Sequence, residues 1–209
     1  MTVRLDRVRT TGVFRLDGGE REVENNVWVL GDEHEAVVID AAHDHRPILN
    51  ALGGRTLRAI VCTHGHNDHV NVAGALADDT GAPVLLHPAD VMLWRDEYPQ
   101  RLPDGELRHG EVLRVGGDEL HVLHTPGHSP GGVCLHQSST HTVFSGDTLF
   151  HGGPGATGRS YSDFATIIDS IQARLLVLPD DTVVHTGHGD DTRIGAEAPH
   201  LGEWLARGH

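Results

Sequence analysis

Cysteine, aromatic residues and long apolar runs are scarce in this chain of 209 residues. Its two cysteines, Cys62 and Cys134, each lie within an apolar run, which favours small buried side chains over a disulfide. Aromatic residues make up 4% of the sequence, so the core is expected to consist of Val, Leu, Ile and Ala. No apolar stretch approaches the ~18 residues that a membrane-spanning helix requires. These absences argue against a membrane protein and against a small disulfide-stabilised domain.

Positive charge is also scarce. The chain has 16 basic and 30 acidic residues, and its formal net charge is −14. Proteins that bind nucleic acid through its phosphates rely on clustered Lys and Arg, so nucleic acid is not an expected partner. The first ten residues, MTVRLDRVRT, lack the apolar core and cleavage signal of a secretory leader, so a cytoplasmic location is expected. The length and the absence of a linker predict a single domain over residues 1–209.

Hydrophobic periodicity and the 26 glycines predict strands and helices that alternate along the chain, with tight turns between them. The expected strands are Asn26–Gly31, Glu35–Ala41, Leu57–Cys62, Pro83–His87, Glu111–Val115, Glu119–His124, Gly132–His136, Thr142–Ser145 and Thr182–Thr186. The expected helices are Arg46–Leu52, His69–Asp79, Pro88–Arg95, a helix capped by Ser162 or Asp163 that runs to about Leu178, and Ile194–Arg207 with an interruption near Pro199. Tyr98–Gly110 is expected to be a surface loop.

The most informative feature is the segment Thr63–His69, which reads THGHNDH. Imidazole and carboxylate groups bind zinc and similar metals, and four such groups lie here within six positions. His64 and His66 are two residues apart at the end of an expected strand, so both can face one ion. Asp68 and His69 are adjacent at an expected helix start and diverge by about 100°, which directs them to a second ion.

Three further polar residues follow expected strands. His128, Asp147 and His188 each come shortly after an apolar run, and each is preceded by a glycine, which allows the backbone a tight path. Strands that end along one edge of a sheet bring the residues that follow them into one crevice. We therefore expect these three side chains to complete a site with two metal ions.

This pattern resembles the metallo-β-lactamase superfamily, whose signature is Thr-His-x-His-x-Asp-His followed by later His, Asp and His ligands. The resemblance covers roughly Asn26 to Gly189. It implies an α/β fold, a four-layer αβ/βα sandwich of two mixed sheets flanked by helices, with the metals along one edge. It also implies that His64, His66 and His128 bind the first metal, that Asp68, His69 and His188 bind the second, and that Asp147 bridges them. Asp40 matches an early Asp of the family, which implies that it orients a ligand His.

Within the superfamily, Ser145–Phe150 (SGDTLF) resembles the glyoxalase II branch, also called hydroxyacylglutathione hydrolases. That branch cleaves thioesters of a low-molecular-weight thiol. The resemblance therefore implies a thioester hydrolase with a metal-bridging hydroxide as the nucleophile. True glyoxalase II enzymes add a C-terminal helical segment that grips glutathione, and this chain ends soon after His188, so the resemblance does not identify the carrier thiol.

The expected chemistry follows from the metals. Two ions about 3.5–4 Å apart lower the pKa of a bridging water towards ~7 and polarise the substrate carbonyl. Asp68 is the expected catalytic residue, which orients the nucleophile and accepts its proton. The ligands favour zinc, and they also accommodate iron or manganese. Two divalent ions would outweigh the charges of Asp68 and Asp147, which suits a small anionic substrate.

Recognition of the substrate is less evident in the sequence. The Gly-rich stretch His151–Asp163 is expected to cover the crevice, where Arg159 and Tyr161 could meet a substrate carboxylate or amide. His43 and His45 match no ligand of the family, and we expect them to be solvated or to lie at the rim of the site.

Three alternatives remain open at this point. A lactonase would use the same ligands and the same hydroxide on an oxygen ester. A persulfide dioxygenase would hold one iron through two His and one Asp, which would be His64, His128 and Asp147. A metal-buffering protein would bind ions weakly at many sites without turnover.

Overall fold

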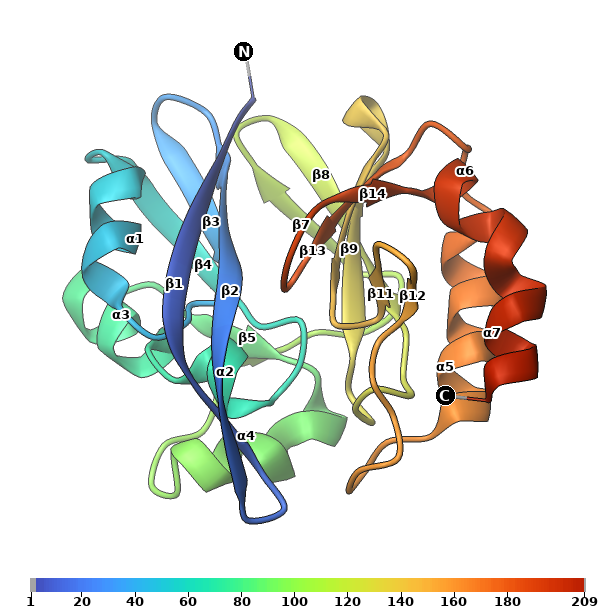
Figure 1. Cartoon of the computed structure of the whole chain (residues 1–209). Helices are drawn as coiled ribbons and strands as arrows, with labels where there is room; N and C mark the ends of the chain where they lie inside the picture. Colours follow the sequence, from blue (N-terminus) through green and yellow to red (C-terminus); the bar gives the residue numbers. More distant parts are fainter. Residues whose placement is uncertain (1–2, 209) are drawn as a thin grey trace.

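Two six-stranded sheets pack face to face, and each sheet comes from one half of the chain (Figure 1). The computed structural model describes residues 3–208. The first sheet contains, in spatial order, β1 (Arg4–Leu16), β2 (Gly19–Gly31), β3 (Glu35–Ile39), β4 (Thr56–Val61), β5 (Val84–Leu86) and β6 (Gly105–Glu106). The strands β1 to β3 pair antiparallel and β3 to β6 pair parallel, so the sheet is mixed.

The second sheet is also mixed, because β10 and β13 pair parallel whereas its other neighbours are antiparallel. In spatial order it contains β14 (Thr192–Arg193), β13 (Val183–Thr186), β10 (Thr142–Gly146), β9 (Val133–Gln137), β8 (Asp118–His124) and β7 (Val112–Val115). A small hairpin of β11 (Leu149–Phe150) and β12 (Gly153–Pro154) follows β10.

Helices cover the outer face of each sheet, as Figure 1 shows. Those of the first half are α1 (His45–Leu52), α2 (Asn67–Val70), α3 (Ala73–Thr80) and α4 (Val91–Glu97). Those of the second half are α5 (Phe164–Ser170), which continues as a π-helical segment over Ile171–Leu175, α6 (Ile194–Glu197) and α7 (Leu201–Arg207). Short 3₁₀ turns occupy Pro88–Asp90, Ser138–Thr140 and Ala198–His200. No helix within residues 3–208 is long and apolar enough to cross a membrane.

Three apolar clusters lie between the four layers, which explains the continuous apolar runs of the central strands. In β3, Ala36 and Val38 pack towards the helices of the first half, whereas Val37 and Ile39 pack between the two sheets. The third cluster joins the second sheet to α5 and α7. A strand with both faces buried needs apolar side chains at every position. The four-layer sandwich predicted from the sequence is thereby confirmed.

Local signals placed several helix ends correctly. The Asp44 side chain accepts a hydrogen bond from Arg46 N at the start of α1, and Gly53 ends this helix in the left-handed conformation with φ 60°. Asp163 is the residue that caps α5, because its carboxylate accepts the Thr166 N–H at 2.7 Å. The break near Pro199 is present as the 3₁₀ turn between α6 and α7.

Four expectations need correction. Strand β1 was not predicted, and β2 begins seven residues before the expected start. The expected helix His69–Asp79 is two helices, because Asn71 and Val72 separate α2 from α3. The expected loop Tyr98–Gly110 contains the short strand β6 and the fully buried Leu107. The helix expected to reach Leu178 ends at Leu175.

Candidate metal centre

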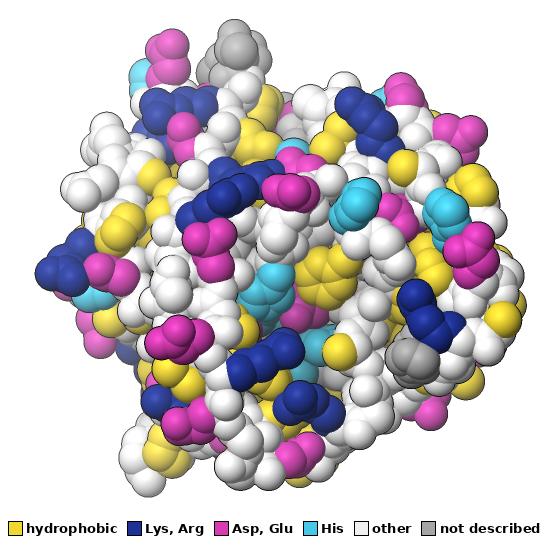
Figure 2. Space-filling model, in the orientation of Figure 1, with side chains coloured by type: hydrophobic (Ala, Val, Ile, Leu, Met, Phe, Trp, Pro, Cys, Tyr) yellow, Lys and Arg dark blue, Asp and Glu magenta, His cyan; other side chains and the backbone are white. Residues whose placement is uncertain are grey.

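The seven predicted side chains converge at one edge of the sandwich, where strands of both sheets end. His64 follows β4, Asp147 follows β10, and His188 follows β13, whereas His128 lies in the loop between β8 and β9. His66 immediately precedes α2, and Asp68 and His69 lie within it. Figure 2 shows His side chains at the floor of a hollow in this face, with basic side chains along its border.

The potential ligand atoms form three overlapping groups, in each of which they lie within 4.8 Å of one another. The groups are His64, His66 and His128; His64, His69 and Asp147; and Asp68, His69 and His188. Asp147 lies between the first and third groups, because its carboxylate is 3.6 Å from His128 Nε2 and 3.4 Å from His188 Nε2. The structure therefore brings together all seven residues, with Asp147 in the central position that a bridging ligand requires.

The spacing of these atoms fits metal coordination. His66 Nδ1 lies 3.0 Å from His128 Nε2, and His69 Nε2 lies 3.2 Å from His188 Nε2. Ligand atoms around a tetrahedral zinc ion, each about 2.0–2.2 Å from it, are about 3.3 Å apart. His64 Nε2 and Asp68 Oδ1 are buried without a hydrogen-bond partner among the described residues. Buried polar atoms are costly when unpaired, so this cluster fits a divalent cation.

Four of the imidazoles are held through the ring nitrogen that faces away from the cluster. The His128 Nδ1–H donates to Ala156 O at 2.9 Å, and the His188 Nδ1–H donates to Glu24 O at 2.7 Å. His69 Nδ1 lies 3.0 Å from Asp40 Oδ2 and His64 Nδ1 lies 3.1 Å from Thr63 Oγ1. These contacts turn each Nε2 lone pair towards the cluster.

Asp40 lies beside His69, one of the clustered His residues. Its carboxylate accepts hydrogen bonds from Thr63 N and Thr63 Oγ1, both at 2.7 Å, as well as the contact from His69. Asp40 is 1% exposed and has a positive φ of 58°, so the chain holds a left-handed conformation to place this carboxylate. One side chain thus positions both Thr63 and His69.

The charge pattern of the cluster also favours a cation. Burial lowers the pKa of His66 to about 3 and that of His64 well below its usual value, so both rings are neutral donors of a lone pair. Burial also opposes the charged form of His188, but Asp147 and Asp68 outweigh it and raise the pKa of His188 to about 10. A proton on His188 balances these carboxylates in the absence of metal, and a divalent ion would replace it.

Three polar residues, Asn71, His43 and Asn25, form a hydrogen-bonded chain that ends at Asp68, and this chain was not predicted from the sequence. The Asn71 side chain accepts the His43 N–H at 2.6 Å, which directs its amino group to His43 Nδ1 at 3.0 Å. His43 Nε2–H then donates to Asn25 Oδ1 at 2.8 Å, and Asn25 Nδ2 donates to Asp68 Oδ2 at 3.3 Å. His43 is thus half-buried and hydrogen-bonded beside the cluster, which excludes a fully solvated side chain and agrees with the alternative expectation that it lies at the rim of the site.

Asp90 was also missed, and it connects two loops of the site. Its carboxylate accepts hydrogen bonds from Gly65 N at 2.8 Å, from Ser129 Oγ at 2.7 Å and from Gly131 N. Gly65 lies between two of the clustered His residues, and Ser129 follows a third. Asp90 is completely buried, so this one side chain fixes the separation of the two loops.

Replacing Asp90 with Ala is expected to lower the free energy of unfolding by about 3 kcal/mol or more, because buried donors lose their acceptor. Urea unfolding of the metal-free protein measures this change. Zinc titration should also show weaker binding, because the loops around His64, His66 and His128 lose their common anchor. Asp96→Ala, at an exposed position of α4, is the matched control. Equal stability of the two variants would contradict the role of Asp90.

The two residues predicted to contact substrate lie in different places. Arg159 lines an open pocket together with His66, Asp68, His128, Asp147 and His188. Tyr161 is 57% exposed and lines a neighbouring hollow with Asp96 and Glu97. Only Arg159 therefore borders the clustered ligands.

Comparisons with known proteins agree with this geometry. The profile of a family described as "Metallo-beta-lactamase superfamily" matches residues 21–188. The chain is 33% identical over 189 residues to hydroxyacylglutathione hydrolase GloC of Haemophilus influenzae, covering 83% of this chain and 89% of the relative. It is also similar to the crystal structure of BLEG-1 B3 metallo-beta-lactamase, with a TM-score of 0.79, 29% identity, and coverage of 93% of this chain and 99% of that chain. The di-iron-bound form of TTHA1623 has a TM-score of 0.73 and 33% identity, over 84% of this chain and 93% of that chain.

Proposed function

Because the chain belongs to the metallo-β-lactamase superfamily, we propose that it is a dinuclear-metal hydrolase that cleaves a thioester of a low-molecular-weight thiol. The main support is the convergence of five imidazoles and two carboxylates with buried, unpaired ligand atoms. The similarity to a hydroxyacylglutathione hydrolase supports the choice of a thioester. The pocket beside the cluster is small, which suits a small molecule rather than a polymer.

The roles of the seven residues follow from their positions. His64, His66 and His128 would hold one metal, Asp68, His69 and His188 the other, and Asp147 both. When bound, two divalent ions lower the pKa of water near neutrality and polarise a carbonyl oxygen. Zinc suits these ligands, and iron or manganese would also bind, so elemental analysis of the purified protein is needed to identify the metal.

We assign the proton transfer to Asp68, and the contacts of its carboxylate support this role. Asn25 donates an N–H to its Oδ2, which fixes the carboxylate plane, whereas Oδ1 is buried and has no hydrogen-bond partner among residues 3–208. A carboxylate held in this way can orient a water molecule and accept its proton during attack on the carbonyl. A thiolate is a good leaving group, so the reaction needs no strong general acid.

A substrate panel on the metal-loaded protein tests the proposal. We expect turnover of S-lactoylglutathione or another small acyl thioester, with kcat/KM at least tenfold higher than for a homoserine lactone or a chromogenic β-lactam. The chelator-treated protein is the control and should be inactive until metal is restored. Faster cleavage of the lactone would support an oxygen-ester hydrolase. Oxygen consumption with glutathione persulfide and one iron per chain would support a dioxygenase, and either result would overturn the proposal.

A further inference from the structure

Two arginines at the metal pocket lack the carboxylate partners that most arginines of this protein have. All 16 basic residues of the chain are arginine. Arg15, for example, pairs with Glu20 at 2.8 Å, and Arg101 pairs with Asp78 at 2.8 Å. Among residues 3–208, Arg21 and Arg159 have no carboxylate oxygen within 4.0 Å, although the net charge is −14. Both line the pocket that holds the clustered His and Asp side chains.

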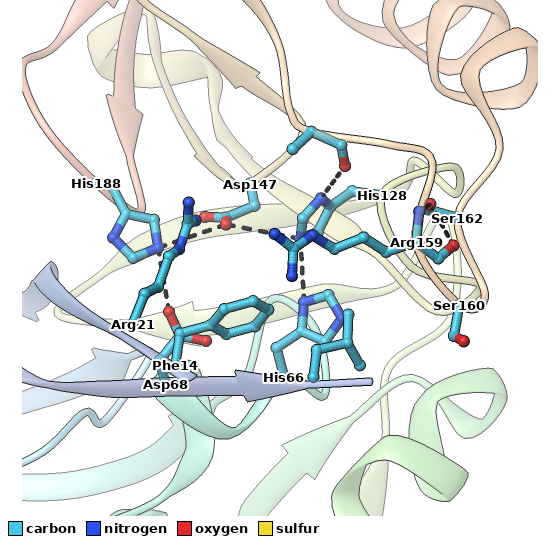
Figure 3. A pocket seen from close by; sticks show the side chains of 12 residues that line it. Phe14, Arg21, His66, Asp68, His128, Asp147, Arg159, Ser160, Ser162 and His188 are labelled. Carbon is cyan, nitrogen blue, oxygen red and sulfur yellow. Dashed lines mark hydrogen bonds and ion pairs between the residues drawn. The ribbon is translucent and has the colours of Figure 1, made fainter. Parts of the chain in front are cut away.

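Phe14 brings the two guanidinium groups to the same place. Phe14 and Arg21 are direct partners in the antiparallel β1–β2 ladder, so their side chains lie on one face of this hairpin. The Arg21 Cζ lies 5.4 Å from the centroid of the Phe14 ring, and the Arg159 Cζ lies 5.8 Å from it. Figure 3 shows Arg21 and Arg159 reaching towards each other across the pocket, in front of Asp147.

This aromatic ring also joins the arginines to the metal cluster. Phe14 is 7% exposed and its ring meets the edge of the His66 ring, with 5.4 Å between the centroids. A buried ring restrains guanidinium groups that lie against it and favours their positive charge. Both arginines therefore line the same pocket as the clustered His and Asp side chains.

We propose that Arg21 and Arg159 form a carboxylate-binding subsite, which selects thioesters that carry a carboxylate a few atoms from the scissile bond. A planar guanidinium donates paired N–H groups that match the two oxygens of a carboxylate. Two unpaired guanidinium groups beside the cluster attract an anion, which an acidic protein would otherwise repel. The proposal rests on the thioester hydrolysis proposed above and specifies its substrate class.

Four synthetic thioesters test the subsite. One carries a carboxylate on the thiol portion (S-acetyl-3-mercaptopropionate), one carries it on the acyl portion (S-ethyl thiosuccinate), and the other two are their neutral methyl esters. For the wild type we expect kcat/KM to be at least tenfold higher for one of the acids than for its methyl ester. The acid that is preferred identifies whether the acyl or the thiol portion meets the arginines.

Arg21→Ala and Arg159→Ala should each reduce the ratio of kcat/KM for the acid to kcat/KM for its methyl ester about tenfold, mainly through KM for the acid. Arg21→Lys should restore part of the preference, because it retains the charge without the paired N–H groups. Arg15→Ala removes a paired arginine from the same hairpin and is the matched control. Thermal unfolding checks that each variant is folded. An unchanged preference in both alanine variants would overturn the subsite.

A binding measurement separates this proposal from the proposed reaction. Thioether analogues of the four compounds cannot be hydrolysed, and calorimetry on the zinc-loaded protein measures their affinity without turnover. Tighter binding of an acid than of its ester, lost in Arg21→Ala and Arg159→Ala, supports the subsite even if no thioester is cleaved. Equal affinities for acids and esters in the wild type would overturn it even if all four thioesters are cleaved.

Discussion

Asp147→Ala is expected to abolish most of the activity and to reduce the bound metal from two ions per chain to one or fewer. The Asp147 carboxylate lies 3.3 Å from His69 Nε2 and 3.6 Å from His128 Nε2, and therefore contacts ligands of both proposed ions. Metal ions supply several kcal/mol of transition-state stabilisation, so we expect kcat to fall about 10³-fold or more. Elemental analysis after dialysis and steady-state kinetics on the preferred substrate measure the two effects.

The matched control for this variant is Asp169→Ala, which removes an exposed carboxylate from α5 and should leave metal content and rate unchanged. Circular dichroism should show that Asp147→Ala is folded, since the three apolar clusters do not include residue 147. Two tightly bound ions and a normal rate in Asp147→Ala would refute the bridging position assigned to this residue.

Gly187→Ala should have an effect almost as large, although it adds a single methyl group. A Cβ at this position would lie 2.4 Å from Asp147 Oδ1 and 2.7 Å from His69 Cε1, so at least one of these side chains would have to move. His69 is completely buried and its ring has no space to withdraw, and a shift of the Asp147 carboxylate would take it away from the clustered His residues. We expect zinc affinity to fall at least 100-fold, as titration against a competing chelator would show, with a comparable loss of kcat/KM.

Gly202→Ala is the control for this variant, because Gly202 lies in α7 and a Cβ there would have no heavy atom within 4 Å. It should keep zinc affinity and should be as stable as the wild type or slightly more stable, since Ala favours a helix. If Gly187→Ala bound zinc as tightly as Gly202→Ala, the close approach of residue 187 to the cluster would be wrong.

The parts of the fold that the sequence predicted are those whose two faces are buried. β3 and β4 have apolar side chains at nearly every position because each contacts two of the apolar clusters. β1 was missed because most of its residues are only partly buried and Arg, Asp and Thr interrupt its apolar positions. Helices α2 and α3 were merged because Ala, Val and Leu keep a helical spacing across Asn71. The break lies where the side-chain oxygen of Asn71 accepts the His43 N–H, a tertiary contact that helical periodicity does not show.

The seven clustered residues were predictable because their type and spacing carry chemical information in themselves. The residues that support them do not have this property. Asn25 reaches the site from β2, and Asp90 from a 3₁₀ turn that otherwise reads as an ordinary helix start. Arg21 lies among many charged residues of an exposed hairpin, and only the strand register places it beside Phe14. Such residues are identified only in the three-dimensional structure, which brings distant segments of the chain together.

The two sheets contribute unequally to the candidate centre, and this division has a mechanical consequence. Four of the clustered residues follow β4 in the first half, whereas His128, Asp147 and His188 belong to the second half. Metal ions coordinated by residues of both halves would link the two sheets directly, in addition to the apolar side chains packed between the sheets. Their binding energy would then add to the cohesion of the two halves. Loss of the metal ions would weaken the association of the two sheets before it affected the packing of the helices on either outer face.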